Sequence, residues 1–232
     1  MKNIAVLFVL ALSLVATCPQ AQEAGAAVAV TGSDALVKKK GRFKETWVRP
    51  DADLARYGKL YLQVVELQFR EKGVKPVENT TMSDQESEFG LSEAEQERYR
   101  QVATEALADE LKRGAKLEMV HEAGPDTLLV RASILDIVCN VPPTFVDRRE
   151  VYPSVVGKGT LRFELIDAET GVIQARLEER SRVLPPSRIA SDVSQMPVYR
   201  ETMWRDIERW SRNGASELRR VLDEAQESHG PK

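Results

Sequence analysis

One carboxylate stands out among the residues that could do chemistry. Asp136 lies inside the apolar run 134–138 (ILDIV), in a segment that we expect to be a buried strand. A carboxylate in such surroundings either is held ionised by a cation or has a raised pKa, and a raised pKa is how proteins make catalytic acids. We favour the first interpretation, in which Asp136 pairs with an arginine at the sheet edge. The second remains the alternative.

A second group of candidates lies in the loop predicted over 141–156, directly after that strand. It contains Arg148, Arg149 and Tyr152, and cations beside an aromatic ring suit an anionic ligand. The same residues are equally suited to a solvent-exposed crossover between two strands, which is the simpler interpretation. We therefore keep Asp136, Arg148, Arg149 and Tyr152 as candidate contacts to a ligand or partner.

Other catalytic and metal-binding patterns are weak. The histidines, His121 and His229, are far apart, and no zinc-ligand spacing occurs. The sequence contains no G-x-S-x-G, Walker or G-x-G-x-x-G pattern. Cys139 ends an apolar segment, which favours a small core residue over a nucleophile. We predict no catalytic, cofactor-binding or metal-binding residue, and we expect that the protein is not an enzyme.

The composition indicates one folded domain and argues against nucleic acid as a partner. Of the 232 residues, 42 % are hydrophobic and 30 % are charged, which is ordinary for a protein with a core. The formal net charge is -3, and aromatic residues, 6 % of the chain, do not alternate with basic ones on one face. The two cysteines, Cys18 and Cys139, are too few for a disulfide framework.

The N-terminus has the pattern of an export signal. Lys2 supplies a positive charge, and residues 4–16 (IAVLFVLALSLVA) form an apolar segment. This segment is shorter than the roughly 20 residues that a membrane-spanning helix needs. We therefore predict a cleavable signal peptide over 1–21 and export to the periplasm or outer membrane.

Two processing sites compete, and they imply different relations to the membrane. Residues 15–18 (VATC) resemble a bacterial lipobox, which makes Cys18 a candidate lipidation site and would give the protein a lipid anchor. Residues 24–26 (AGA) match the A-x-A pattern of ordinary signal peptidase. The sequence leaves both alternatives open.

The rest of the chain divides into a tether, a domain and a tail. Residues 22–45 begin with small residues and include the basic stretch Lys38-Lys39-Lys40, so we predict a flexible tether. Its lysines suit anionic lipid headgroups, although a solvated run of charge is the simpler interpretation. A single α+β domain is predicted over 46–227 and a disordered tail over 228–232.

Periodicity predicts about five strands. Apolar residues at alternate positions, or on both faces, indicate strands over 59–69, 117–120 and 128–139 and a hairpin over 160–183.

Two helices are also expected. Ser92 and Glu95 form a capping box at the start of the first, which we expect to end at Gly114. The second is predicted over 200–227, and Trp204 and Trp210 belong to its apolar stripe and hence to the core. A two-layer α+β sandwich, with both helices on one face of a mainly antiparallel sheet, would bury these patterns.

The register of the predicted hairpin follows from its turn and its charges. With Gly171 in the left-handed conformation of a short turn, Glu164 faces Arg176 and Arg162 faces Glu178. A shift by two residues would place Arg162 opposite Arg176, which like-charge repulsion disfavours. We therefore expect a solvent-exposed ladder of alternating charges.

Three ordered motifs resemble a known bacterial family. They are WVRPDADL at 47–54 followed by Tyr57, GPDTLLVRA at 124–132, and a hairpin at 159–171 that ends in DAETG. Together they resemble the domain of unknown function 3313 proteins over about residues 45–225. The resemblance implies a predicted lipoprotein, although Thr17 departs from the small residue usual before a lipidated cysteine. It implies no reaction and no active-site residue.

These observations predict a non-enzymatic envelope protein that binds a protein partner, through an open sheet edge. The order of strands and helices also looks like that of small domains in envelope-assembly lipoproteins, which supports the prediction only by analogy. The alternative is a periplasmic ligand-binding module, or an enzyme, that uses Asp136 and the 141–156 loop.

Overall fold

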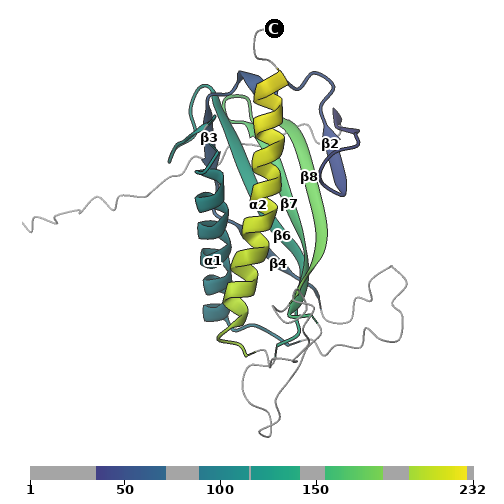
Figure 1. The fold of residues 1–232 in the computed structure, drawn as a ribbon, viewed down its shortest axis with the longest axis vertical. Helices are drawn as coiled ribbons and strands as arrows, with labels where there is room; N and C mark the ends of the chain where they lie inside the picture. Colours follow the sequence, from purple (N-terminus) through teal and green to yellow (C-terminus); the bar gives the residue numbers. More distant parts are fainter. Residues whose placement is uncertain (1–34, 72–88, 115, 142–154, 185–198, 229–232) are drawn as a thin grey trace, which may run out of the picture.

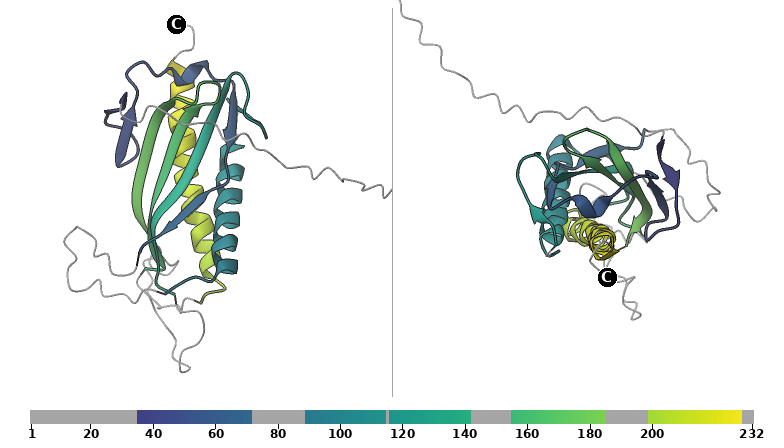
Figure 2. Two further views of the ribbon diagram at one scale, coloured as in Figure 1. Left: turned by 180° about the vertical axis from the view of Figure 1, so that it is seen from behind. Right: turned by 90° about the horizontal axis from the view of Figure 1, so that it is seen from above.

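The computed structural model describes residues 35–71, 89–114, 116–141, 155–184 and 199–228. In these residues a mixed, mainly antiparallel sheet of eight strands packs against two helices, and both helices cover the same face (Figures 1 and 2). The predicted α+β class is confirmed. The sheet has eight strands rather than about five because its first two strands were not predicted and the strand predicted over 59–69 is divided in two.

Three long strands form the centre of the sheet, namely β6 (Thr127–Cys139), β7 (Gly157–Asp167) and β8 (Ile173–Val183). β7 lies between the other two and pairs antiparallel with both. Alternate residues of β6 and β7 are buried beneath the helices, as period-two alternation requires; these are Leu128, Val130, Ala132, Ile134, Leu161, Phe163 and Leu165.

Short strands complete the two edges. β1 (Val37–Lys38) and β2 (Glu45–Val48) extend the sheet beyond β8. On the other side, β3 (Lys59–Leu62) and β5 (Glu118–Met119) extend it beyond β6, and β4 (Glu66–Phe69) also pairs with β6. The pairs that involve β3, β4, β5 and β6 with one another are parallel, which makes the sheet mixed.

The strand predicted over 59–69 is therefore two strands, β3 and β4, which pair with successive parts of β6. The break lies next to Val65, whose side chain is buried. Its backbone N–H donates to Thr104 Oγ1 at 3.1 Å rather than to a strand. A continuous apolar run cannot reveal such a break because both strands share the same composition.

The first helix, α1 (Glu93–Leu111), begins as predicted. Ser92 Oγ accepts from the Glu95 N–H at 3.4 Å, and the Glu95 carboxylate accepts from the Ser92 N–H at 2.8 Å, so the capping box is confirmed. The helix ends at Leu111, before the expected Gly114. The second helix, α2 (Met203–Ser228), begins three residues later than predicted, after a turn in which the Tyr199 carbonyl accepts from the Met203 N–H.

The core lies between the helices and the covered face of the sheet. Leu107 of α1, Leu218 of α2 and Phe163 of β7 are fully buried, and side chains of this size contribute about 1.5–3 kcal/mol each. Trp204 lies in this core, as predicted. Trp210 is only partly buried, and its indole N–H donates to Ser181 Oγ.

The ordered fold begins earlier than predicted. Residues expected in the tether form β1, and Phe43, which follows the lysines, is buried 5.8 Å from the ring of Phe163. Hydrophobic burial of Phe43 therefore makes the basic stretch part of the domain. The predicted signal peptide, Cys18 and the competing cleavage site lie outside the described residues. None of the helices that are described is long and apolar enough to span a membrane.

Gly214 sets the distance between α2 and β7. A Cβ at this position would overlap the Leu161 side chain and lie 4.0 Å from Phe163 Cζ. Gly214→Ala should thus destabilise the protein by about 1–2 kcal/mol, because overpacking outweighs the gain of up to about 1 kcal/mol in helix propensity. Chemical denaturation measures this loss. Gly124→Ala, where a Cβ meets no atom within 4 Å, is the control and should be near neutral.

Candidate functional site

Asp136 lies near the end of β6, at a bulge. The pairing with β7 shifts between Leu135 and Val138, and the backbone of Asp136 has a φ of 53°. A bulge bends a strand and re-aims a side chain, and aspartate tolerates the left-handed region better than most residues. The conformation therefore serves to direct the Asp136 carboxylate.

The carboxylate is directed to Arg70, which follows β4. Arg70 Nε donates to Asp136 Oδ1 at 2.6 Å, and Arg70 Nη2 donates to Oδ2 at 2.8 Å. Arg180 of β8 lies 3.6 Å from Oδ2. Asp136 thus pairs with arginines, which is the interpretation that the sequence favoured.

The electrostatics of Asp136 follow from these contacts. The hydrogen bonds from Arg70 lower the pKa of Asp136 below its ordinary value and outweigh the opposite effect of burial, and the charges of Arg70 and Arg180 act in the same direction. The carboxylate is therefore ionised at neutral pH. Such a group accepts hydrogen bonds and positions cations, whereas a catalytic acid needs a raised pKa.

The other candidates from the sequence cannot be placed beside Asp136. Arg148, Arg149 and Tyr152 lie outside the described residues, as does most of the 141–156 loop.

A second shared carboxylate, which the sequence only half predicted, lies in the middle of the sheet. Glu164 Oε1 accepts from Arg176 Nη2 at 2.9 Å, and Glu164 Oε2 accepts from Arg131 Nη1 at 3.4 Å. The predicted pairing of Glu164 with Arg176 is confirmed, as is that of Arg162 with Glu178 (2.6 Å). Glu164 is, however, only 9 % exposed. The predicted solvent-exposed ladder was wrong at this residue, because Arg131 of β6 covers it.

These ion pairs lie on the face of the sheet that neither helix covers, seen from behind in Figure 2 (left). We call this the uncovered face and define it by Arg131, Arg162, Glu164, Arg176 and Glu178. They alternate along their strands with residues of the helix-covered core. Three guanidinium groups share two carboxylates here, so this set carries net positive charge.

Two further features border the uncovered face. Trp47 of β2 is in register with Arg176, and the Lys38 ammonium lies 5.7 Å from the centre of its ring. At the turn end of the hairpin, a small apolar cluster covers the sheet, and its members are Leu36, Tyr61, Leu129, Ile166, Ala168 and Ile173. Along the strands, the uncovered face therefore changes from the apolar cluster at the turn end to partly exposed charged side chains farther from the turn.

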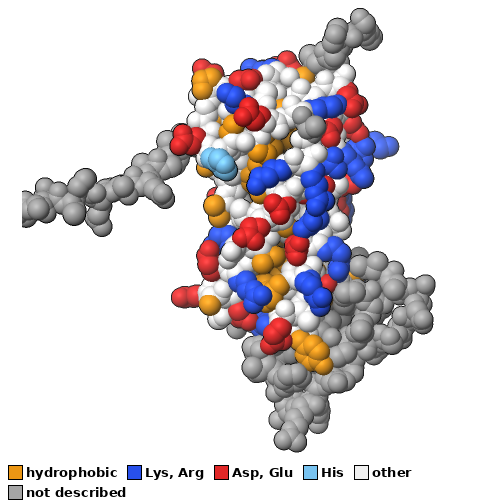
Figure 3. Space-filling model, turned by 60° about the vertical axis from the view of Figure 1, so that its left-hand side comes forward, with side chains coloured by type: hydrophobic (Ala, Val, Ile, Leu, Met, Phe, Trp, Pro, Cys, Tyr) orange, Lys and Arg blue, Asp and Glu red, His pale blue; other side chains and the backbone are white. Residues whose placement is uncertain are grey.

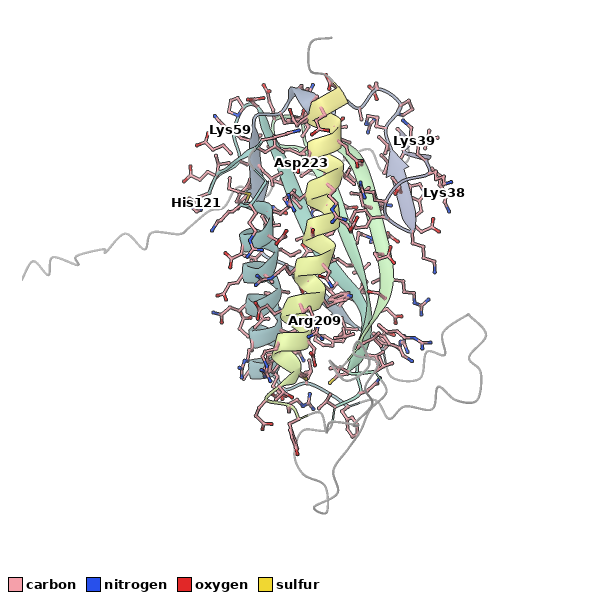
Figure 4. The ribbon with its side chains drawn as sticks, viewed as in Figure 1. Lys38, Lys39, Lys59, His121, Arg209 and Asp223 are labelled. Atoms are coloured by element: carbon pink, nitrogen blue, oxygen red, sulfur yellow. The ribbon has the colours of Figure 1, made fainter. Side chains whose placement is uncertain are left out.

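The strands β1 and β2 and their connecting residues 39–44 form a hairpin at the sheet edge, which we call the basic hairpin. It displays Lys38 and Lys39 at the side of the molecule (Figure 4). Its lysines, with Arg42 and Glu179, line an open hollow of about 610 Å³. Figure 3, which shows the α1 side of the molecule, instead displays basic and acidic side chains interspersed with apolar ones.

The three sequence motifs meet at the turn end of the sheet, around Asp167. The Tyr57 hydroxyl donates to Asp167 Oδ2 at 2.9 Å, and Asp167 Oδ1 accepts from the N–H groups of Glu169 (3.0 Å) and Thr170 (2.9 Å). Arg56 forms a salt bridge with the same carboxylate. These contacts satisfy both oxygens of a buried carboxylate and join residues 56–57 to the hairpin. The Ala168 N–H also donates to the Thr127 carbonyl at 3.1 Å, which joins the third segment to the other two.

The remaining reactive group, the Cys139 thiol, is buried. Burial raises its pKa, which keeps it protonated, although Arg200 Nη1 donates to its sulfur at 3.5 Å. In the part of the chain that the structure describes, no group of His, Cys, Asp and Glu side chains is placed to hold a metal ion.

Comparison with known proteins decides the family. The model of the family described as "Protein of unknown function (DUF3313)" matches residues 26–180. This chain belongs to the DUF3313 family. The match covers most of the sheet, including all three motifs, so the resemblance drawn from them is confirmed. No curated protein matches the chain.

Two solved structures show distant likeness to this DUF3313 chain. A PelC dodecamer from Paraburkholderia phytofirmans is 12 % identical with a TM-score of 0.32, covering 79 % of this chain and 96 % of that one. A neuraminyllactose-binding hemagglutinin homolog from Helicobacter pylori is 9 % identical with a TM-score of 0.38, covering 77 % and 90 %. Scores this low carry no statement about what the DUF3313 chain does.

Asp136 should make stability depend on acid pH. Its folded pKa is lowered, so its contribution is present above the unfolded pKa of about 4 and is lost as the pH falls through the folded pKa. Asp136→Asn should cost about 1 kcal/mol or less at pH 7, because the salt bridge is partly exposed, and should flatten the acid limb of the unfolding free energy. If the unfolding free energy of Asp136→Asn falls with acid pH just as that of the wild type does, this role of Asp136 is contradicted.

The backbone at Asp136 provides a matched comparison. Valine tolerates a positive φ far less well than asparagine. Asp136→Val should therefore cost about 1–3 kcal/mol more than Asp136→Asn, as strained backbone conformations do. Equal unfolding free energies of the two variants would show that the bulge relaxes without cost.

Asp167 should contribute to the stability of the fold. Asp167→Asn weakens the salt bridge to Arg56 and alters the contact with Tyr57 at a side chain that is 3 % exposed, although Arg56 itself is 54 % exposed, and changes of this kind cost about 2–4 kcal/mol. Tyr57→Phe removes a hydroxyl that donates to Asp167 and accepts from Arg56 Nη2 at 3.0 Å, and it should cost about 1–2 kcal/mol. Urea denaturation of both variants measures the difference, and a cost for Asp167→Asn below that of Tyr57→Phe would refute the assigned role.

Proposed function

We propose that this DUF3313 protein is a non-enzymatic protein of the bacterial envelope, exported by its predicted signal peptide, and that it binds a protein partner through the uncovered face. The observation that carries the proposal is the set of arginines that carboxylates hold on this face beside Trp47. Arginine and tryptophan are among the residues that contribute most energy at protein interfaces.

The arginines of the uncovered face are pre-ordered for binding. The side chains of Arg131, Arg162 and Arg176 are 24 %, 34 % and 27 % exposed, and each donates to Glu164 or Glu178. Ordering a long side chain at an interface costs about 0.5–1.5 kcal/mol, and here most of that ordering is complete before the partner arrives. Pre-ordering supports a binding role for the face.

The charge of the uncovered face indicates the chemistry of the partner. Glu164 lies between two guanidinium groups, so a positive excess remains after pairing. A partner surface rich in Asp and Glu would complete the network, because additional carboxylates can accept from the same guanidinium groups. Association should then be faster at low salt.

A binding role also fits Asp136 better than catalysis does. The guanidinium of Arg70 keeps the carboxylate ionised, so its contribution is to hold Arg70 and Arg180 in place near the end of the sheet. We therefore propose the uncovered face, rather than the sheet edge that the sequence suggested, as the partner-binding surface.

Site-specific photo-crosslinking in intact cells tests the proposal. A photoreactive residue replaces Thr160, which lies opposite Arg180 on the uncovered face, in the full-length chain. We expect capture of one recurrent envelope protein, and we expect Arg162→Gln with Arg176→Gln to reduce that capture at least tenfold while the protein stays folded.

The matched control carries the photoreactive residue at Asn213, an exposed position of α2. Capture of the same protein at both positions would mean that contact is not confined to the uncovered face. Failure to capture any protein at Thr160, or capture that does not depend on Arg162 and Arg176, would refute the proposal.

A further inference from the structure

The basic hairpin carries charge that its surroundings do not neutralise. Lys39, Lys40 and Lys44 are exposed, and among the described residues none of their ammonium groups forms a salt bridge with a carboxylate. The carboxylates that do reach the hairpin are engaged elsewhere on it. Glu45 pairs with Lys38, and Glu179 accepts from the backbone N–H of Lys44.

The domain holds this hairpin firmly. Arg42 Nε donates to Glu224 Oε1 at 2.9 Å, and Arg42 Nη1 lies 3.5 Å from Glu217 Oε2, both on α2. Phe43 is buried against Phe163. The lysines therefore move with the domain and present their charge from one side of it, which a flexible tether could not do.

From this geometry we propose that the basic hairpin docks the protein onto a lipid bilayer that bears anionic headgroups. Each lysine near such a surface strengthens binding by about fivefold. Val37, at the edge of the hairpin, is 50 % exposed and can enter the apolar part of the interface. Lysines with an exposed aliphatic side chain suit the boundary between headgroups and acyl chains.

A bilayer fits these residues better than an acidic protein does. Lysine is depleted at protein interfaces, where arginine and aromatic side chains are enriched, and the tip of the hairpin carries lysines. The cations of the uncovered face are instead arginines. The two surfaces are therefore suited to different partners.

The position of the hairpin in the chain also supports docking onto a bilayer. It is the first described strand pair after the predicted processing sites, and Val37 lies 19 positions after Cys18. A chain of that length reaches at most roughly 65 Å. If Cys18 is lipidated, the hairpin lies within that distance of the bilayer, and its lysines would orient the domain on it.

Vesicle sedimentation of the chain from Pro19 onward, produced without the predicted signal segment so that no acyl chain contributes, tests this inference. We expect binding to phosphatidylcholine vesicles that contain phosphatidylglycerol, weak binding to phosphatidylcholine alone, and loss of binding as salt rises. The variant Lys39→Glu, Lys40→Glu, Lys44→Glu should lower the partition coefficient by at least about 100-fold, because each lost lysine costs about fivefold and each added carboxylate is repelled by the headgroups.

The control reverses the same number of charges at exposed positions of the two-helix side, Lys112→Glu, Arg205→Glu and Arg220→Glu, and should retain most of the vesicle binding. Equal loss of vesicle binding in both variants would show that net charge alone explains the binding, and it would overturn the proposal. Binding of the hairpin lysines to a soluble acidic polymer but not to vesicles would overturn it as well. Unchanged crosslinking at Thr160 in the hairpin variant would show that the two surfaces act independently.

Discussion

Burial of one sheet face beneath two helices is the constraint on which the rest of this structure depends. The apolar residues of β6, β7 and β8 that face α1 and α2 form a single core. Gly214 lets α2 approach Leu161 and Phe163 closely enough to close it. Because both helices lie on the same side, the opposite face must be compatible with water through its own side chains.

The chain meets that requirement by sharing carboxylates between guanidinium groups. Placing Glu164 between Arg131 and Arg176 removes a carboxylate from water, which is costly unless its lone pairs are satisfied. Here both oxygens accept hydrogen bonds. The result is an ordered charged layer over the middle of this face, and fully satisfied polar networks of this kind rigidify a structure.

Charge is also segregated across the molecule. The chain as a whole carries -3, yet the basic hairpin and the paired set on the uncovered face are positive. Compensating acidic residues therefore lie elsewhere, some of them on α2, where Glu217 and Glu224 hold Arg42. A molecule with this distribution has a preferred orientation in any external field.

Local signals predicted part of this structure well. The capping box at Ser92, the pairing of Glu164 with Arg176 and the left-handed Gly171 (φ 70°) each depend on residues close in sequence. Contacts from distant segments were not predictable in this way. The Arg70 that holds Asp136 is 66 residues away, and Arg131 reaches Glu164 from another strand.

Two predicted boundaries, the end of the tether and the extent of the strand over 59–69, differ from the structure for a related reason. The basic stretch looked like a tether because its lysines dominate the composition, whereas one buried phenylalanine, Phe43, determines its structure. The division of 59–69 into β3 and β4 depends on a hydrogen bond from Val65 to Thr104 on α1. Neither feature leaves a periodic pattern in the sequence.

The bulge at Asp136 has a consequence for how this position can change by mutation. A single-nucleotide change converts an aspartate codon into one for asparagine or glycine, which tolerate the left-handed backbone but remove the charge that Arg70 requires. Another single change gives glutamate, which keeps the charge but moves it one methylene farther from a backbone with φ of 53°. Of the genetic code's twenty residues, aspartate alone meets both demands, so any substitution of this residue loses the charge, the backbone fit or both.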